Sequence, residues 1–136
     1  MPYTLHWEAP DGVLRRYTGR VTADERRESF ERICADPRFD RLRYAITDYL
    51  GVTDYEVRAE STEEIAALHV APLLTNPGIR IAAVATQPAV LAAIAHFKAL
   101  GFIGDQPYGV FDTEAQARQW IADLPRPLAV PRRHLL

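Results

Sequence analysis

Three helix-start signals recur along this chain of 136 residues, and each of them follows a strand-like run of apolar residues. They are the capping boxes that begin at Thr22, Ser61 and Thr113. In a capping box the hydroxyl of the first residue accepts a hydrogen bond from the backbone N–H three residues on. A Glu or Gln side chain at that later position accepts one from the first residue. Helices that start in this way after strands predict a layered α/β domain.

The spacing of apolar residues supplies the remaining elements of the expected fold. A period of two predicts strands, and a period near 3.6 predicts helices. We expect strands over residues 3–8, 13–21, 42–48, 79–85 and 108–111, and helices that begin at Thr22, Ser61, Pro88 and Thr113. The order is β-β-α-β-α-β-α-β-α, and right-handed crossovers then give a mixed β-sheet of about five strands flanked by helices. Residues 79–85 hold a single polar residue, which predicts a central strand buried on both faces.

Several local signals refine this expectation. The pair Asp11-Gly12 predicts a tight hairpin turn with positive φ angles. The stretch Tyr49–Glu60 is the longest without a regular pattern, and loops of that length tend to be functional. Pro72 predicts a kink in the helix around it, and Gly101 predicts a helix C-cap. We expect one domain over residues 1–124, followed by a C-terminal tail over 125–136 that contains Pro and Arg.

Composition excludes several classes of function. The formal net charge of -2 and the isoelectric point near 6.1 predict no electrostatic attraction to nucleic acid or to an anionic membrane. Polar residues interrupt every apolar run before the roughly 18 residues that are needed to span a bilayer. The first residues lack the pattern of a signal peptide, and Cys34 is the only cysteine, so no disulfide can form within the chain. These features together predict a cytoplasmic protein.

Candidate ligand-binding residues follow from the expected topology. In open α/β sheets a ligand settles beyond the carboxyl ends of the strands, where the next helices begin. The residues at this edge and on the helix that follows it are Asp48, Tyr49, Leu50, Thr53, Asp54, Tyr55, Ser61, Thr62, Ile65 and Leu68. No glycine-rich phosphate loop accompanies them, which argues against a nucleotide-binding fold.

The sequence shows no catalytic, metal-binding or cofactor motif, and we assign no residue to those roles. Asp48 and Asp54 are the carboxylates that could serve acid/base chemistry or hold a hard cation, although a strand-end Asp more often orders its own loop. His69 and His96 lie near apolar helix faces and are expected to be hydrogen-bonded structural residues. The first helix carries charges of both signs, Arg26 among them, on a face that we expect to be solvated.

Two sets of segments resemble known domains. Residues 44–48 (Tyr-Ala-Ile-Thr-Asp), 51–53 (Gly-Val-Thr) and 81–85 (Ile-Ala-Ala-Val-Ala) resemble STAS domains, which are typified by sporulation anti-sigma-factor antagonists. Residues 17–22 and 111–120 are similar to the divergent bacterial SpoIIAA-like group, also described as STAS/SEC14-like. The resemblance spans about residues 3–124. It implies a mixed sheet flanked by helices and a non-enzymatic role.

The resemblance also bears on regulation. Antagonist STAS domains carry an Asp-Ser-(Ser/Ala)-Gly stretch soon after the strand, and a partner kinase phosphorylates its serine. The corresponding residues here are Asp54-Tyr55-Glu56-Val57, with neither serine nor glycine. We therefore expect no phosphoserine switch unless an insertion brings Ser61 into that position.

Three hypotheses for function follow. The first is a binding module without cofactor for an apolar or lipid-like small molecule, in a cleft lined by Leu50, Tyr55, Ile65 and Leu68. The second is a protein-interaction regulator of the antagonist type, which would use the surface from Asp48 to Thr62. An enzyme built on Asp48 and Asp54 ranks last. The sequence leaves the oligomeric state open, a homodimer included.

Overall fold

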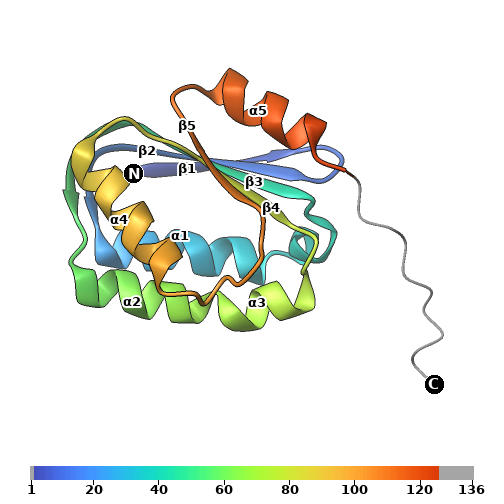
Figure 1. Cartoon of the computed structure of the whole chain (residues 1–136), viewed down its shortest axis with the longest axis horizontal. Helices are drawn as coiled ribbons and strands as arrows, with labels where there is room; N and C mark the ends of the chain where they lie inside the picture. The colour runs from blue at the N-terminus through green and yellow to red at the C-terminus, as the bar shows by residue number, and fades with distance from the viewer. Residues whose placement is uncertain (1, 126–136) are drawn as a thin grey trace.

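The fold is built on one five-stranded sheet, seen in the computed structural model, which describes residues 2–125 (Figure 1). The strands lie side by side in chain order: β1 (Tyr3–Glu8), β2 (Gly12–Thr22), β3 (Tyr44–Glu56), β4 (Arg80–Val84) and β5 (Tyr108–Phe111). β1 runs antiparallel to β2, and every other neighbouring pair is parallel. The mixed sheet expected from the sequence is confirmed. The tail beyond Pro125 lies outside the described residues.

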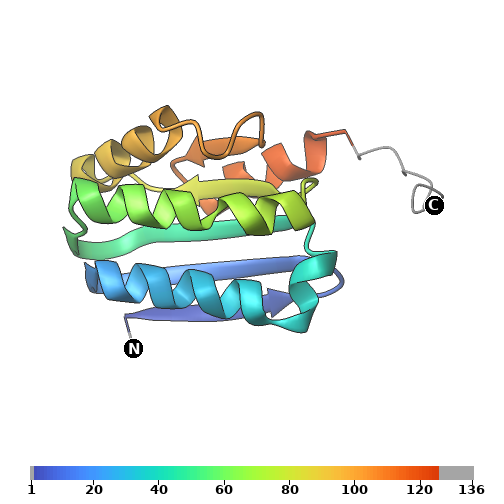
Figure 2. The same cartoon turned by 90° about the horizontal axis from the view of Figure 1, so that it is seen from below.

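The helices cover the two faces of the sheet unequally. They are α1 (Ala23–Ala35), α2 (Ala59–Leu68), α3 (Val70–Thr75), α4 (Pro88–Ala99) and α5 (Glu114–Asp123), with a 3₁₀ turn, η1 (Pro37–Arg41), after α1. Helices α1 to α4 lie on one face, and α5 lies alone on the other (Figure 1). Seen from below, α1, the α2–α3 pair and α4 run alongside one another across the sheet (Figure 2). The α/β class and the predicted order of strands and helices are confirmed.

Each face of the sheet has its own apolar core. On the α5 face, Leu14, Ile46 and Val84 of three neighbouring strands pack with Ala117 and Ile121 of the helix. The opposite face holds three further clusters between the strands and helices α1 to α4. Strand side chains alternate between the two faces, so the inner strands are apolar on both.

Two of the three expected capping boxes are present. Thr22 accepts from the backbone N–H of Glu25, whose carboxylate accepts from the Thr22 N–H at 2.8 Å. Thr113 and Gln116 make the same reciprocal pair at the start of α5. The box expected at Ser61 is wrong, because α2 begins two residues earlier, at Ala59, and has no side-chain cap.

The loop expected over Tyr49–Glu60 is also wrong, because β3 continues through Glu56. β3 contains two extra residues relative to its partner β2. From Asp48 to Gly51 it advances by three residues while β2 advances by two, and the second extra residue follows Val52. Each such bulge breaks the alternation that marks a strand in a sequence. For this reason the second half of β3 lacked a recognisable period.

The strand over residues 79–85 is internal and largely buried, as expected, but it is not the middle strand. Arg80–Val84 pairs with β3 on one side and β5 on the other, and β3 holds the central position. The predicted break at Pro72 is confirmed, since α2 ends at Leu68 and α3 starts at Val70. Gly101 follows α4 with a φ of 78°, in agreement with its expected capping role.

The first hairpin turn differs from the expectation. Gly12 does not adopt a positive φ; it is the first residue of β2 and pairs with Glu8. A side chain at position 12 would overlap the ring of Tyr44, so close packing explains this glycine. The turn itself is formed by residues 9–11, in which the Ala9-Pro10 peptide bond is cis.

The two kinds of helix start give a matched test. The Thr113→Ala variant should lose about 1 kcal/mol of unfolding free energy, because the first turn of α5 loses its cap. The Ser61→Ala variant should change that free energy by less than about 0.5 kcal/mol, since Ser61 caps nothing and Ala favours a helix. Urea denaturation measures both values. Equal losses in the two variants would show that the capping assignment is wrong.

Candidate functional site

A small cavity lies at the carboxyl end of β3, beneath helices α2 and α4. It has a volume of about 20 Å³, which is room for about one water molecule. Five elements or their flanks contribute to its walls. The lining residues are Arg26, Tyr49, Tyr55, Val57, Thr62, Ile65, Ala93, Ile94, Phe97 and Tyr108. Parallel sheets characteristically bind ligands at this edge.

Four of the residues predicted from the sequence meet in this cavity. Tyr49 and Tyr55 reach it from β3, and Thr62 and Ile65 reach it from α2. Tyr49 and Tyr55 are six residues apart and lie on the same face of the sheet, and the two bulges in β3 bring Val52 onto that face as well.

Leu50 and Leu68 do not join them. Leu50 is 43% exposed on β3, and Leu68 is 40% exposed on α2. Leu68 lines a separate, shallow apolar depression between α1 and α2, together with Phe30, Cys34 and Pro72. The apolar cleft that was expected to contain both leucines is therefore not formed in this structure.

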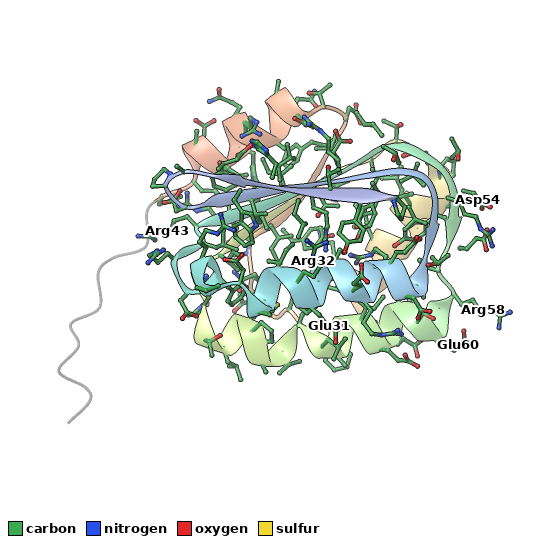
Figure 3. All side chains as sticks on the ribbon, turned by 180° about the vertical axis from the view of Figure 1, so that it is seen from behind. Glu31, Arg32, Arg43, Asp54, Arg58 and Glu60 are labelled. Carbon is green, nitrogen blue, oxygen red and sulfur yellow. The ribbon has the colours of Figure 1, made fainter. Side chains whose placement is uncertain are left out.

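The carboxylates predicted at this edge have other partners. Asp48 accepts from the backbone N–H of Leu50 at 2.8 Å and lies 3.8 Å from Arg16. Asp54 lies near Glu56 and Arg20 and points outward, at the same end of the molecule as Arg58 and Glu60 (Figure 3). The two aspartates are six positions apart along β3, a distance of roughly 20 Å, so the structure does not bring them together.

Thr53 and Ser61 lie outside the cavity as well. Thr53 is exposed on β3, and Ser61 is half-buried in the first turn of α2. Within the described part of the chain, no three His, Cys, Asp or Glu side chains form a group that could hold a metal ion.

Arg26 lines the cavity, although the sequence analysis placed it on a solvated surface. Its side chain is buried, with 7% of the residue exposed. Its Nε donates to the Tyr55 hydroxyl at 3.2 Å, and its Nη1 donates to the Tyr17 hydroxyl at 3.3 Å. Burial forces the guanidinium to be satisfied by these neutral hydroxyl groups.

A second buried arginine, Arg15, also lies near Tyr17. Arg15 is 8% exposed and donates to the Thr47 hydroxyl through Nε and Nη2, at 3.2 and 2.9 Å. Its Nη1 donates to Ser29 Oγ at 3.0 Å. Both guanidinium groups also lie over the Tyr17 ring, at 5.3 Å for Arg15 and 5.8 Å for Arg26, within cation–π range.

Neither buried arginine has a carboxylate partner among the described residues. The ion pairs of this part of the chain involve other arginines and one histidine. The two cations act on the tyrosines instead. They lower the pKa of Tyr17 although burial opposes this. Burial raises the pKa of Tyr49, and it raises the pKa of Tyr108 to about 12.

Several polar groups around the cavity lack a partner in the protein. Every fully enclosed side-chain nitrogen or oxygen in residues 2–125 has a hydrogen-bond partner. The hydroxyls of Tyr49, Tyr108 and Thr62 make no hydrogen bond to a described residue, so they are not fully enclosed. Tyr49 and Thr62 are buried residues, and both line the cavity. The site therefore presents free hydroxyl groups beside a buried cation.

The sequence contained a signal for both arginines. Arg15 shares its strand face with Val13 and Tyr17, which are buried. Arg26 is four residues before Phe30 and seven before Ile33, the stripe by which α1 faces the sheet. A charged residue at a core position is the informative exception to the pattern.

The fold resembles two solved structures. The first is the anti-sigma factor antagonist SpoIIAA in its unphosphorylated form, with a TM-score of 0.57 at 14% sequence identity, over 90% of this chain and 99% of that one. The second is a protein from the DUF3478 family with a SpoIIAA-like fold, from Shewanella loihica PV-4. Its TM-score is 0.54 at 12% identity, over 88% of this chain and 91% of that one.

The chain therefore has a SpoIIAA-like fold, as the sequence resemblance implied. No protein-family model matches the sequence, and no curated protein matches it either. Between residues 2 and 125, none of the helices has the length and apolar character that crossing a membrane requires.

His69 supports one wall of the cavity. Its ring stacks on Phe30 with centroids 3.9 Å apart and meets Phe97, a lining residue, edge-on at 4.8 Å. Nδ1 lies 2.7 Å from the carbonyl oxygen of Ile65. Burial lowers the pKa of His69 to about 3, and the charges of Arg26 and Arg15 contribute to that shift. It is a hydrogen-bonded structural histidine, as expected.

This histidine makes stability depend on pH. The unfolded chain binds a proton at His69 below about pH 6.5, and the folded protein does so only near pH 3. Acidification between those values therefore favours unfolding, by up to about 1.4 kcal/mol per pH unit. Urea denaturation from about pH 6.5 to about pH 4 should give a smaller loss for His69→Gln than for the unmodified protein.

The exposed His6 provides the control for that experiment. The His6→Gln variant should keep the acid-dependent loss of the unmodified protein. If His69→Gln also keeps it, His69 is already protonated in the folded state near neutral pH, and its assignment as a buried neutral side chain is wrong.

Proposed function

We propose that this protein is a non-enzymatic binding module for a small molecule and that its binding site is the cavity at the end of β3. The observation that carries the proposal is the convergence of β3, α2, α4 and β5 on a cavity that ends on the buried guanidinium of Arg26. Aromatic walls with a few convergent polar groups are typical of small-molecule sites.

The titration behaviour of the lining residues favours binding over catalysis. A general acid or base works best when its pKa lies near the working pH. Among the lining residues, Tyr49 and Tyr108 have raised pKa values, and the pKa of Arg26 is raised well above its ordinary value. None of these groups exchanges protons readily near neutral pH.

The volume of the cavity favours a smaller and more polar ligand than the lipid-like molecule expected from the sequence. Sites for drug-sized ligands typically have volumes of about 300–1,000 Å³. The cavity here measures about 20 Å³. We therefore propose a ligand, or a ligand group, of only a few non-hydrogen atoms.

A protein-interaction regulator is the second candidate, and the fold similarity to the antagonist SpoIIAA favours it. The partner surface in this case would be the exposed end of β3, with Leu50, Thr53 and Asp54. A phosphoserine switch is not part of this proposal, because Asp54-Tyr55-Glu56 lies within a strand and Thr62 lines the cavity.

Methyl NMR tests the proposed binding site. We expect at least one of four small compounds, formate, formamide, acetate and acetamide, to shift the Ile65 and Ile94 methyl signals in a saturable way, because both side chains line the cavity. Ile46 and Ile121 lie on the α5 face and should not move. A panel that shifts no cavity methyl, or that shifts all four isoleucines alike, would contradict the proposal.

The Leu68→Asp variant is the matched control. Leu68 belongs to the same helix as Ile65 but lines the separate depression beside α1. Binding measured at the Ile65 methyl should therefore survive this substitution. Loss of binding in a folded Leu68→Asp protein would move the site to the surface between α1 and α2.

A further inference from the structure

We propose that the cavity binds a compact anion no larger than a carboxylate group, held by the Arg26 guanidinium and the tyrosine hydroxyls around it. This inference rests on the proposed function and names the chemical class of its ligand. Three observations support it: the buried arginines have no carboxylate partner among the described residues, several hydroxyl groups at the cavity have no hydrogen-bond partner there, and the cavity is small.

The charge around Tyr17 is not balanced by the described protein. Two buried guanidinium groups lie within 6 Å of its ring, and neither is paired with a carboxylate of residues 2–125. Arginine stays protonated in proteins, so both groups carry a charge. Even an ionised Tyr17 would neutralise only one of them. A buried ion without a counter-charge costs several kcal/mol, which a bound anion would offset.

The cavity offers several hydrogen-bond donors that have no partner among the described residues. Tyr55 accepts from Arg26, so its own hydroxyl hydrogen is free to be donated. The hydroxyls of Tyr49, Tyr108 and Thr62 have no partner in the described chain, and all three residues line the cavity. Each hydroxyl can donate one hydrogen bond. An anion can accept from all of these hydroxyls, and its charge is opposite to that of the buried Arg26 guanidinium.

The residues that carry these hydroxyl groups line the same cavity. The charge of Arg26 acts on both Tyr49 and Tyr55, and it lowers the pKa of Tyr108 against the effect of burial. Tyr49 also meets Tyr55 edge-on, with ring centroids 6.1 Å apart. The volume of about 20 Å³ is room for about one water molecule, so it admits a halide ion or one oxygen of a carboxylate group. These two sources share the same chemistry, that of a compact monovalent anion.

A pair of nearly isosteric compounds tests the charge requirement. Formate and formamide are titrated separately into the full chain at constant ionic strength, with sodium isethionate as the bulky reference salt. The Ile65 and Ile94 methyl signals report occupancy. We expect formate to bind at least about ten-fold more tightly than formamide, because hydrogen bonds to a charged group are the stronger ones. Competition by sodium chloride shows whether a halide occupies the same site.

Conservative variants test the proposed donors. Tyr49→Phe and Tyr108→Phe each remove one hydroxyl and keep the ring, and each should weaken formate binding by about ten-fold. Tyr44→Phe is the matched control, because Tyr44 packs on the α5 face and its hydroxyl donates to Glu8. It should leave formate binding unchanged. Arg26→Met should abolish binding, and the two tyrosine variants decide the matter if that protein does not fold.

The outcomes separate this inference from the proposed function. Binding of formate or chloride that depends on Tyr49 and Tyr108 supports the inference. Equal binding of formate and formamide at the cavity methyls overturns the anion assignment and leaves the binding module intact. Formate binding that is insensitive to both tyrosine variants also overturns the assignment. If neither compound moves the Ile65 and Ile94 signals, the inference fails, and the broader four-compound panel decides the proposed function.

Discussion

The parallel pairing of β2 with β3 is the interaction on which the rest of the structure depends. It is the longest strand pair, from Gly12↔Tyr44 to Thr22↔Glu56, and β3 is the middle strand of the sheet. Two bulges in β3 shift its register against β2, so that Tyr49, Val52 and Tyr55 all face helices α1 to α4. A regular strand would have placed Val52 on the opposite face. Tyr49 and Tyr55 share a face with or without the bulges, so the irregularity adds Val52 to the apolar cluster beside the candidate site.

The same pairing explains how two arginines can be buried. Arg15 on β2 reaches Thr47 on β3, and Ser29 on α1 completes its hydrogen bonds. Both guanidinium groups lie over the Tyr17 ring, within 6 Å of its centroid. Ser29 donates to the carbonyl oxygen of Arg26 at 3.0 Å, and it lies 2.5 Å from the Tyr17 hydroxyl. Hydroxyl groups and aromatic rings thus take the place of a carboxylate. These neutral groups stabilise the two cations only in part.

The sequence predicted those parts of the fold that rest on local chemistry. Thr22 and Thr113 cap helices because each has a Glu or Gln three residues later, and Pro72 ends α2 because it has no N–H to donate. Ser61 has the same local pattern and still caps nothing. The N-cap position of α2 is occupied by Arg58, whose backbone is extended, and the helix begins at the next residue, Ala59. A local motif contains no information on tertiary packing, which determines that α2 begins at Ala59 and not after Ser61.

The candidate site was predictable in part for a similar reason. The rule that ligands lie at the carboxyl ends of strands located Tyr49, Tyr55, Thr62 and Ile65 correctly in one cavity. It could not separate them from Leu50, because it selects residues by their place along the chain and not by the face on which a side chain lies, and Leu50 is 43% exposed. Arg26 was missed because charged residues on a helix are most often solvated.

A crystal structure of the protein grown in sodium bromide tests the central claim most directly. Bromide is a compact anion whose anomalous scattering identifies it without ambiguity. We expect an anomalous peak in the cavity, within hydrogen-bond distance of the Arg26 guanidinium and the Tyr49 hydroxyl. Bromide found only on exposed surfaces, with water alone beside Arg26, would contradict the claim that the buried cations of this fold bind an anion.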